Sequence, residues 1–240
     1  MTVRRPTQVG SIRRLCIGSD PIRRTIYVLG MVPAVSNFYL GVMDQLGADP
    51  QKALERLLGL WALRFLILSL SITPLRRLGG QNFVRYRRAL GLLAFYYATL
   101  HLTVYTVLDQ GLDLAAIWAD IVKRPYITVG MLAFVIVAPL AATSNAPMIR
   151  RLGGARWQRL HRFVYVAAAA AAVHFVMVVK SWPAEPLIYA GVVAALLLIR
   201  LATRLQKGAV HARPPRRATD AAAVPRGLSD ARASLDPATL

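Results

Sequence analysis

The feature that most constrains this chain is a set of long apolar stretches separated by short polar connections. An α-helix needs about 20 mostly apolar residues to cross the hydrocarbon core of a bilayer. Six stretches reach or approach that length, and each is too long to be a strand: 26–43, 57–73, 89–108, 126–143, 163–179 and 187–205. They predict an all-α, polytopic membrane protein built as a six-helix bundle.

Composition agrees with a membrane protein and argues against a soluble globule. The chain is 56% hydrophobic, yet it carries a net charge of +19. The arginines lie in short clusters between the apolar stretches, which favours anionic lipid headgroups over nucleic acid as their partner. Cys16 is the single cysteine, so a disulfide framework or thiolate metal site within one chain is excluded. No soluble nucleotide-binding fold fits between the stretches.

The charged residues predict which side of the membrane each connection faces. Basic residues gather in alternate connections, which hold Arg76, Arg77, Arg85, Arg87 and Arg88 after the second stretch and Arg150, Arg151, Arg156, Arg159 and Arg162 after the fourth. The intervening connections are acidic. The positive-inside rule then places both termini in the cytoplasm. We expect a basic cytoplasmic segment over 1–25, a transmembrane domain over 26–206 and a disordered cytoplasmic tail over 207–240.

Three histidines lie in or beside the apolar stretches, where ionisable residues are costly and usually functional. His101 lies in the third stretch, and His161 and His174 lie at the two ends of the fifth. Imidazole suits iron, copper or zinc, but a zinc site usually adds carboxylates or thiolates, and these stretches contain none. Histidines that face each other from two helices suit a haem with two imidazole ligands.

Depth along the helices predicts which histidines share a ligand. The third and fifth stretches both run outward, so His101 and His174 lie at a similar depth toward the outer side. His161 lies about 20 Å inward of His174, at 1.5 Å rise per residue. We therefore expect His101 and His174 to be the axial pair of an outer haem. His161 and His174 lie on different faces of an ideal helix, so a twist or a π-bulge would be needed to turn both toward the third helix.

A short internal repeat in the sequence, which we call the echo, extends this reasoning to the inner side. The sequence RRLGG occurs at 76–80 and at 150–154, and His101 and His174 follow at nearly equal offsets. Arg87 occupies the offset of His161. His161 is then a candidate ligand of a second, inner haem, with Arg87 and Arg88 as contacts for its propionates. Arg64, toward the outer side of the second stretch, is compatible with pairing to a propionate of the outer haem and equally with snorkelling to headgroups.

Several passages resemble one family of membrane proteins. They are RRALGL at 87–92, ATLHL at 98–102, RWQRLHRFVY at 156–165 and PLIYAG at 186–191, together with ITPL at 72–75 and RPY at 124–126. Over roughly residues 25–205 they resemble the MsrQ (YedZ) family, the haem-binding membrane subunits of the bacterial periplasmic methionine sulfoxide reductase system. This family belongs to the ferric-reductase-like transmembrane group, whose members usually carry two histidines on each of two helices. This chain has only His101 on the third.

The resemblance implies a function and a set of partners. It implies electron transfer through haem b, with FMN as a further cofactor to which we assign no residues. Electrons would pass across the bacterial inner membrane to a periplasmic, molybdenum-containing (molybdopterin) reductase that repairs oxidised methionines of envelope proteins. The chain would then be an electron-transfer subunit without a substrate site of its own. A quinol and a cytoplasmic flavin reductase are both compatible donors.

Two other functions compete with this one. A metal-ion or small-molecule transporter would use the histidines as a transit site, but it should show polar residues along a path and inverted repeats. Besides the histidines, Asn37 and Arg64 are the main polar residues that interrupt the apolar interior, and the echo is parallel. A purely structural anchor leaves the histidines unexplained. The outer connection 109–124 is predicted to form a surface helix, which would either dock the partner protein or lie on the headgroups.

Overall fold

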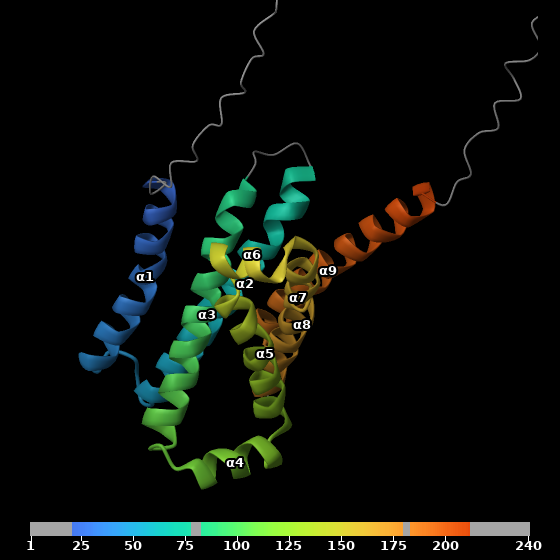
Figure 1. Cartoon of the computed structure of the whole chain (residues 1–240). Coiled ribbons are helices and arrows are strands. Elements are labelled where there is room, and N and C mark those ends of the chain that lie inside the picture. Colours follow the sequence, from blue (N-terminus) through green and yellow to red (C-terminus); the bar gives the residue numbers. More distant parts are fainter. Residues whose placement is uncertain (1–20, 78–82, 180–182, 212–240) are drawn as a thin grey trace, which may run out of the picture. The chain divides into compact units, whose positions relative to one another are not determined.

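The computed structural model describes residues 21–77, 83–179 and 183–211, and every regular element in these segments is helical (Figure 1). In chain order the elements are α1 (Pro21–Val42), α2 (Pro50–Arg77), η1 (Phe83–Tyr86), α3 (Arg87–Thr103), the π-helical η2 (Val104–Asp109), α4 (Leu114–Lys123), α5 (Pro125–Ala142), α6 (Ala146–Leu152), α7 (Gly154–His161), α8 (Val164–Val178) and α9 (Ala184–His211). Six helical segments are long and apolar enough to cross a membrane. Each overlaps one predicted stretch, which confirms the all-α, polytopic fold.

The helix boundaries differ from the predicted ones where polar residues begin or continue a helix. The second spanning helix begins at Pro50 rather than at 57. The side chain of Asp49 accepts a hydrogen bond from the Lys52 backbone N–H (3.2 Å), and proline is favoured in the first turn, so the helix starts before its apolar part. Glu55 therefore lies inside α2, although the sequence suggested spanning helices without carboxylates.

The C-terminal boundary also differs, because α9 continues to His211 and makes residues 207–211 of the predicted disordered tail helical. The rest of that tail, the N-terminal segment with Cys16 and the glycines of the first RRLGG lie outside the described residues. The chain divides into two compact units, 1–199 and 200–240. The packing described below lies within the first unit.

Two helix pairs form the framework of the first unit. α2 packs along α3, and α5 packs along α8, while α3 also contacts α5. The core is made of large side chains such as Leu58, Leu70 and Tyr97, together with the fully buried alanines Ala167 and Ala168 of α8. Small residues of this kind let helices approach closely in a membrane. The alanine run therefore serves helix packing.

The hydroxyl of Tyr97 joins α3 to α1 at a break in the α1 hydrogen-bond ladder. It donates to the Gly30 carbonyl (2.7 Å) and accepts from the Ala34 backbone N–H (2.9 Å). Gly30 and Ala34 are the two ends of one helical turn, so the hydroxyl is inserted between them. Pro33, which has no N–H to donate, lies in the same turn. An inserted side chain and a proline are both known causes of a helix bend.

We expect Tyr97→Phe to lower the free energy of unfolding by about 1–3 kcal/mol, the cost of leaving buried polar groups unpaired. Denaturant or thermal unfolding of the purified protein measures this change. Tyr96→Phe is the matched control because the Tyr96 ring packs edge-on against Tyr97 (5.7 Å between centroids), and its hydroxyl makes no hydrogen bond within the described segments. Equal effects of the two substitutions would contradict the role given to the Tyr97 hydroxyl.

Candidate functional site

The structure brings together two histidines that are distant in sequence. His101 lies on α3 and His174 lies on α8. Their ring centroids are 6.2 Å apart, with the ring planes inclined by 74°. These are the two histidines that the sequence places at a similar depth. The pair therefore joins the two helix pairs of the framework, one histidine from each.

Each histidine ring packs against the other helix of its own pair, and the two arrangements are alike. In each one, which we call a cradle, a backbone carbonyl contacts Nδ1 and a glycine lies one helical turn further on. The Nδ1 atom of His101 lies 2.8 Å from the Glu55 carbonyl oxygen of α2. The residue one turn further on is Gly59, and a Cβ built there would lie 3.1 Å from the same nitrogen. A carbonyl holds the ring by its edge, and the missing side chain of the glycine gives the ring its space.

The second cradle repeats this arrangement on α5. The Nδ1 atom of His174 lies 2.7 Å from the Tyr126 carbonyl oxygen. Again the residue one turn further on is a glycine, Gly130, where a Cβ would lie 2.8 Å from Nδ1. The internal echo of the sequence thus has a structural counterpart. Each half of the framework supplies one carbonyl, one glycine and one histidine.

The cradles fix the tautomer of both rings. A carbonyl oxygen only accepts hydrogen bonds, so Nδ1 must carry the proton in each ring. The Nε2 atom is then unprotonated and available as a ligand, the usual arrangement of a metal-binding histidine. Among the residues that the structure describes, neither Nε2 of the pair has a hydrogen-bond partner.

The pair fits a haem iron better than a bare metal ion. With metal–nitrogen bonds of about 2 Å, two opposed imidazoles on one metal would have centroids roughly 6 Å apart, close to the 6.2 Å observed. The described segments contain no group of three or more histidine, cysteine, aspartate or glutamate residues that could hold a metal ion. Two imidazoles with no further protein ligands would suit a haem iron, whose other ligands come from the cofactor itself.

His161 lies apart from this pair, at the last residue of α7. The chain turns at Arg162 and Phe163 before α8 begins, so the two histidines of the fifth stretch lie on separate helices. The ring of His161 stacks on Trp157 with 3.9 Å between centroids. Its Nε2 lies 3.3 Å from the Thr143 hydroxyl. The interruption between α7 and α8 is a turn, where the sequence suggested a twist or a π-bulge within one helix.

The arginines named from the sequence have different surroundings. Arg87, the first residue of α3, lies close enough for its charge to act on the His161 ring, whereas Arg88 is exposed. Arg64 lies near the middle of α2. Its Nε donates to the Tyr189 hydroxyl (2.8 Å) and its guanidinium lies 4.8 Å from the centre of the Trp61 ring. These contacts, from α2 and α9, hold the half-buried Arg64 side chain.

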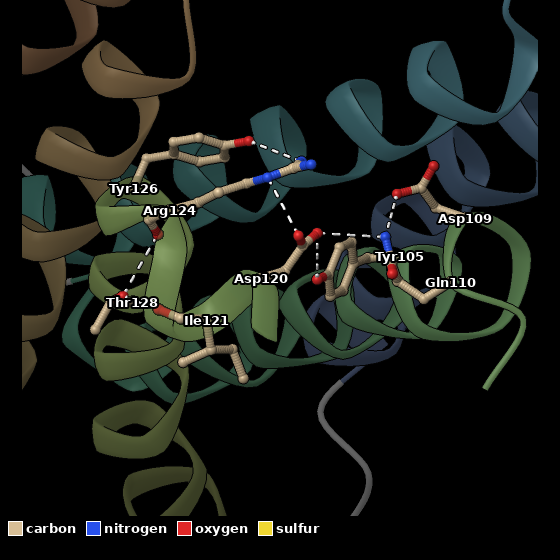
Figure 2. Close-up of polar contacts among 8 residues, drawn as sticks. All are labelled: Tyr105, Asp109, Gln110, Asp120, Ile121, Arg124, Tyr126 and Thr128. Atoms are coloured by element: carbon tan, nitrogen blue, oxygen red, sulfur yellow. Dashed lines mark hydrogen bonds and ion pairs between the residues drawn. The ribbon is translucent and has the colours of Figure 1, made fainter. Parts of the chain in front are cut away.

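A polar cluster lies beside the His174 cradle, around Asp120 at the end of α4 (Figure 2). We call it the Asp120 cluster, and its members are Tyr105, Gln110, Asp120, Arg124 and Tyr126. The Asp120 carboxylate lies 3.2 Å from Arg124 Nε and accepts from the Tyr105 hydroxyl at 3.4 Å. The Tyr126 hydroxyl, followed by the Asp120 carboxylate, raises the pKa of the Arg124 guanidinium above its ordinary value. Arg124 is therefore charged at any physiological pH.

The two cradles could not be predicted from the sequence, because a contact made by a backbone carbonyl does not depend on the type of side chain. The glycines did carry a signal. Gly59 and Gly130 each interrupt an apolar helix, where glycine is disfavoured by about 1 kcal/mol relative to alanine. Each also precedes an RRLGG motif within its own half of the echo.

Comparison with known proteins identifies the family of the chain. Residues 58–172 match the family described as ferric reductase like transmembrane component. The chain is 64% identical over 177 residues to proteins of Brucella ovis, Brucella canis and Brucella suis named protein-methionine-sulfoxide reductase heme-binding subunit MsrQ. The aligned region covers 74% of this chain and 80% of each relative. The chain therefore belongs to the MsrQ family of haem-binding subunits, within the ferric-reductase-like transmembrane group.

Proposed function

We propose that this protein carries electrons across the bacterial inner membrane through haem b to a periplasmic, molybdopterin-containing methionine sulfoxide reductase, which repairs oxidised envelope proteins. The observation that carries the proposal is the His101–His174 pair, whose rings lie 6.2 Å apart with both Nε2 atoms available. The 64% identity to haem-binding subunits supports the choice of haem. The name of those relatives supports a reductase as the partner.

The residues of the chain do three things in this proposal. His101 and His174 would hold the haem iron through Nε2, and the Glu55 and Tyr126 carbonyls orient the rings and increase their basicity. The apolar helices keep water away from the site. When bound, the haem supplies one-electron redox chemistry, and the protein contributes ligands, orientation and a dry environment.

The inner half of the protein has a separate role in the proposal. His161 is the candidate ligand of a second haem, and Arg87 and Arg88 are the candidate partners of its propionates, because guanidinium groups match carboxylates. Arg64 remains a candidate contact for a propionate of the outer haem. FMN is proposed on the family resemblance alone. Quinol and a cytoplasmic flavin reductase remain the two candidate donors, with both termini in the cytoplasm.

The transporter alternative is less well supported. A transit site needs a hydrated path of polar groups through the bundle. In the described spanning segments, the Nδ1 atoms of both histidines are already held by carbonyls, and Arg64 is held by Tyr189. A permanent cofactor explains such fixed rings better than a passing ion.

Reconstitution tests the proposed function. The purified protein, placed in nanodiscs with its haem reduced by dithionite, should be reoxidised by the reductase subunit together with a methionine sulfoxide substrate. Reoxidation should require both the reductase and the substrate. A haem that stays reduced when both are present would overturn the electron-transfer role while leaving haem binding intact.

The surface helix predicted over 109–124 is present as α4. Its Leu114, Trp118 and Val122 follow one another at helical spacing on one face, and they are 77%, 69% and 67% exposed. The opposite face carries Asp120, about 160° around the helix from Trp118. α4 leads directly into α5, whose Tyr126 carbonyl contacts the His174 ring. We therefore propose that the apolar face of α4 docks the reductase.

We expect Trp118→Ala to slow reoxidation by subsaturating reductase roughly 30-fold, the effect of losing about 2 kcal/mol at an interface hot spot. Haem content should not change. Val135→Ala is the control, because Val135 is 61% exposed on a spanning helix rather than on α4. An unchanged rate in the Trp118 variant would remove α4 from the docking surface and leave it as a headgroup-bound helix.

A further inference from the structure

The two histidine cradles have the same construction but different positions in their helices. Glu55, which holds His101, lies beyond the first turn of α2, since that helix begins at Pro50. Tyr126, which holds His174, is the second residue of α5, which begins at Pro125. Helix ends open more easily than helix interiors. The carbonyl that holds His174 therefore depends on whatever fixes the start of α5.

Arg124 is the single residue between α4 and α5, and it fixes that start from both sides. Its backbone N–H donates to the Asp120 carbonyl (2.9 Å), and its own carbonyl accepts from the Ile127 N–H (3.0 Å). Its guanidinium lies 3.2 Å from the Asp120 carboxylate through Nε and 3.4 Å from the Tyr126 hydroxyl through Nη1 (Figure 2). A movement of Asp120 would thus be passed to the first turn of α5.

Asp120 is in turn tied to the segment that follows the helix of His101. Its carboxylate accepts from the Tyr105 hydroxyl (3.4 Å) and from Gln110 Nε2 (3.5 Å), both on or next to η2. The Asp120 side chain is 16% exposed, against 52% for Arg124. Shielding and several partners make this cluster stiffer than an isolated surface ion pair, which is worth about 0–1 kcal/mol.

We propose that Asp120 is a positioning residue that acts through Arg124 to hold the Tyr126 carbonyl in place, and thereby sets the orientation and basicity of the His174 imidazole. This inference rests on the proposed role of His174 as a haem ligand. A hydrogen bond from Nδ1 to a carbonyl makes an imidazole a stronger donor to the metal. A stronger donor favours the ferric state, so loosening the carbonyl raises the reduction potential of the haem.

Asp120→Ala and Asp120→Asn in the full-length protein test this inference. Three quantities are measured: haem per chain, the low-spin EPR spectrum of the oxidised protein, and the midpoint potential. We expect haem content to be kept, the EPR signal to shift or broaden, and the potential to rise. The asparagine variant keeps an oxygen acceptor but loses the charge, so its changes should be smaller than those of Asp120→Ala and in the same direction.

Glu185→Gln is the matched control. It breaks the exposed Arg56–Glu185 ion pair (2.8 Å), which lies next to the His101 cradle. Because Glu55 lies within α2, its carbonyl should not move, and the potential should stay at the wild-type value. Tyr126→Phe removes only the hydroxyl that contacts Arg124. If Asp120→Ala does not accumulate as folded protein, the potential and EPR spectrum of Tyr126→Phe test the positioning role instead.

The outcomes separate this inference from the proposed function. Wild-type potential and EPR spectrum in Asp120→Asn and Tyr126→Phe would overturn the positioning role, even if His174→Ala loses the haem. An equal shift in Glu185→Gln would also overturn it, because the effect would then be a general one of outer-surface charge. If His174→Ala keeps an unchanged low-spin spectrum, the ligand assignment itself fails.

Discussion

Replacing either His101 or His174 with alanine is expected to abolish the low-spin spectrum of the haem that the pair holds. Each substitution would remove one of the two proposed ligands, which should weaken haem binding by more than the roughly 10–100-fold typical of losing a residue that only supports a ligand. The two ring centroids are 6.2 Å apart, and each ring would supply a different ligand, so neither loss can be compensated by the other. Haem content per chain and the visible spectrum of the purified variants measure the effect.

His161→Ala provides the comparison within the same protein. Its ring stacks on Trp157 and contacts Thr143, away from the His101–His174 pair. The low-spin spectrum of the pair should therefore survive this substitution, and any loss should concern a second haem only. The pairing of His101 with His174 would be refuted if His161→Ala lost the low-spin signal while His174→Ala kept it.

Gly130→Ala is expected to have the second-largest effect, although it changes no ligand. A Cβ at this position would lie 2.8 Å from Nδ1 of His174, closer than atoms in contact can come. The ring must then leave the Tyr126 carbonyl, and haem affinity should fall by roughly 10–100-fold, as it does when partners of metal-bound histidines are lost. Gly59→Ala should have a smaller effect, because the corresponding distance is 3.1 Å.

Gly191→Ala is the control for glycine replacement in a spanning helix. A Cβ at Gly191 meets no atom within 4 Å, so alanine should be neutral or stabilise the helix by up to about 1 kcal/mol. Titration of haem into apoprotein measures all three affinities. If Gly130→Ala binds haem as tightly as Gly191→Ala does, the cradle does not position His174.

Much of the fold could be predicted because a membrane leaves few choices. Apolar runs of spanning length identified the six long helices of the described residues, and the helix predicted within 109–124 is present as α4, Leu114–Lys123. Boundaries were less predictable where a polar group caps a helix, as Asp49 does before α2. Such caps depend on a single hydrogen bond and not on a periodic pattern.

The proximity of His101 and His174 was predictable from side-chain depth. Rise per residue along two helices that run the same way was enough to place His101 opposite His174. The partners of the rings were not predictable, because the Glu55 and Tyr126 carbonyls belong to the backbone and their side chains play no part in the contact. The hydrogen bond from Arg64 to Tyr189 of α9 was not predictable either, because it joins residues that are far apart in the sequence.

The most direct test of the central claim is the spectroscopy of the purified full-length protein. Visible absorption in the oxidised and reduced states, with EPR of the oxidised protein, reports both the presence of haem and the nature of its axial ligands. We expect a reducible haem b with a low-spin, bis-histidine signature, at a ratio of at least one haem per chain. A protein that folds without haem, or whose haem is high-spin with a single histidine ligand, would contradict the assignment of His101 and His174.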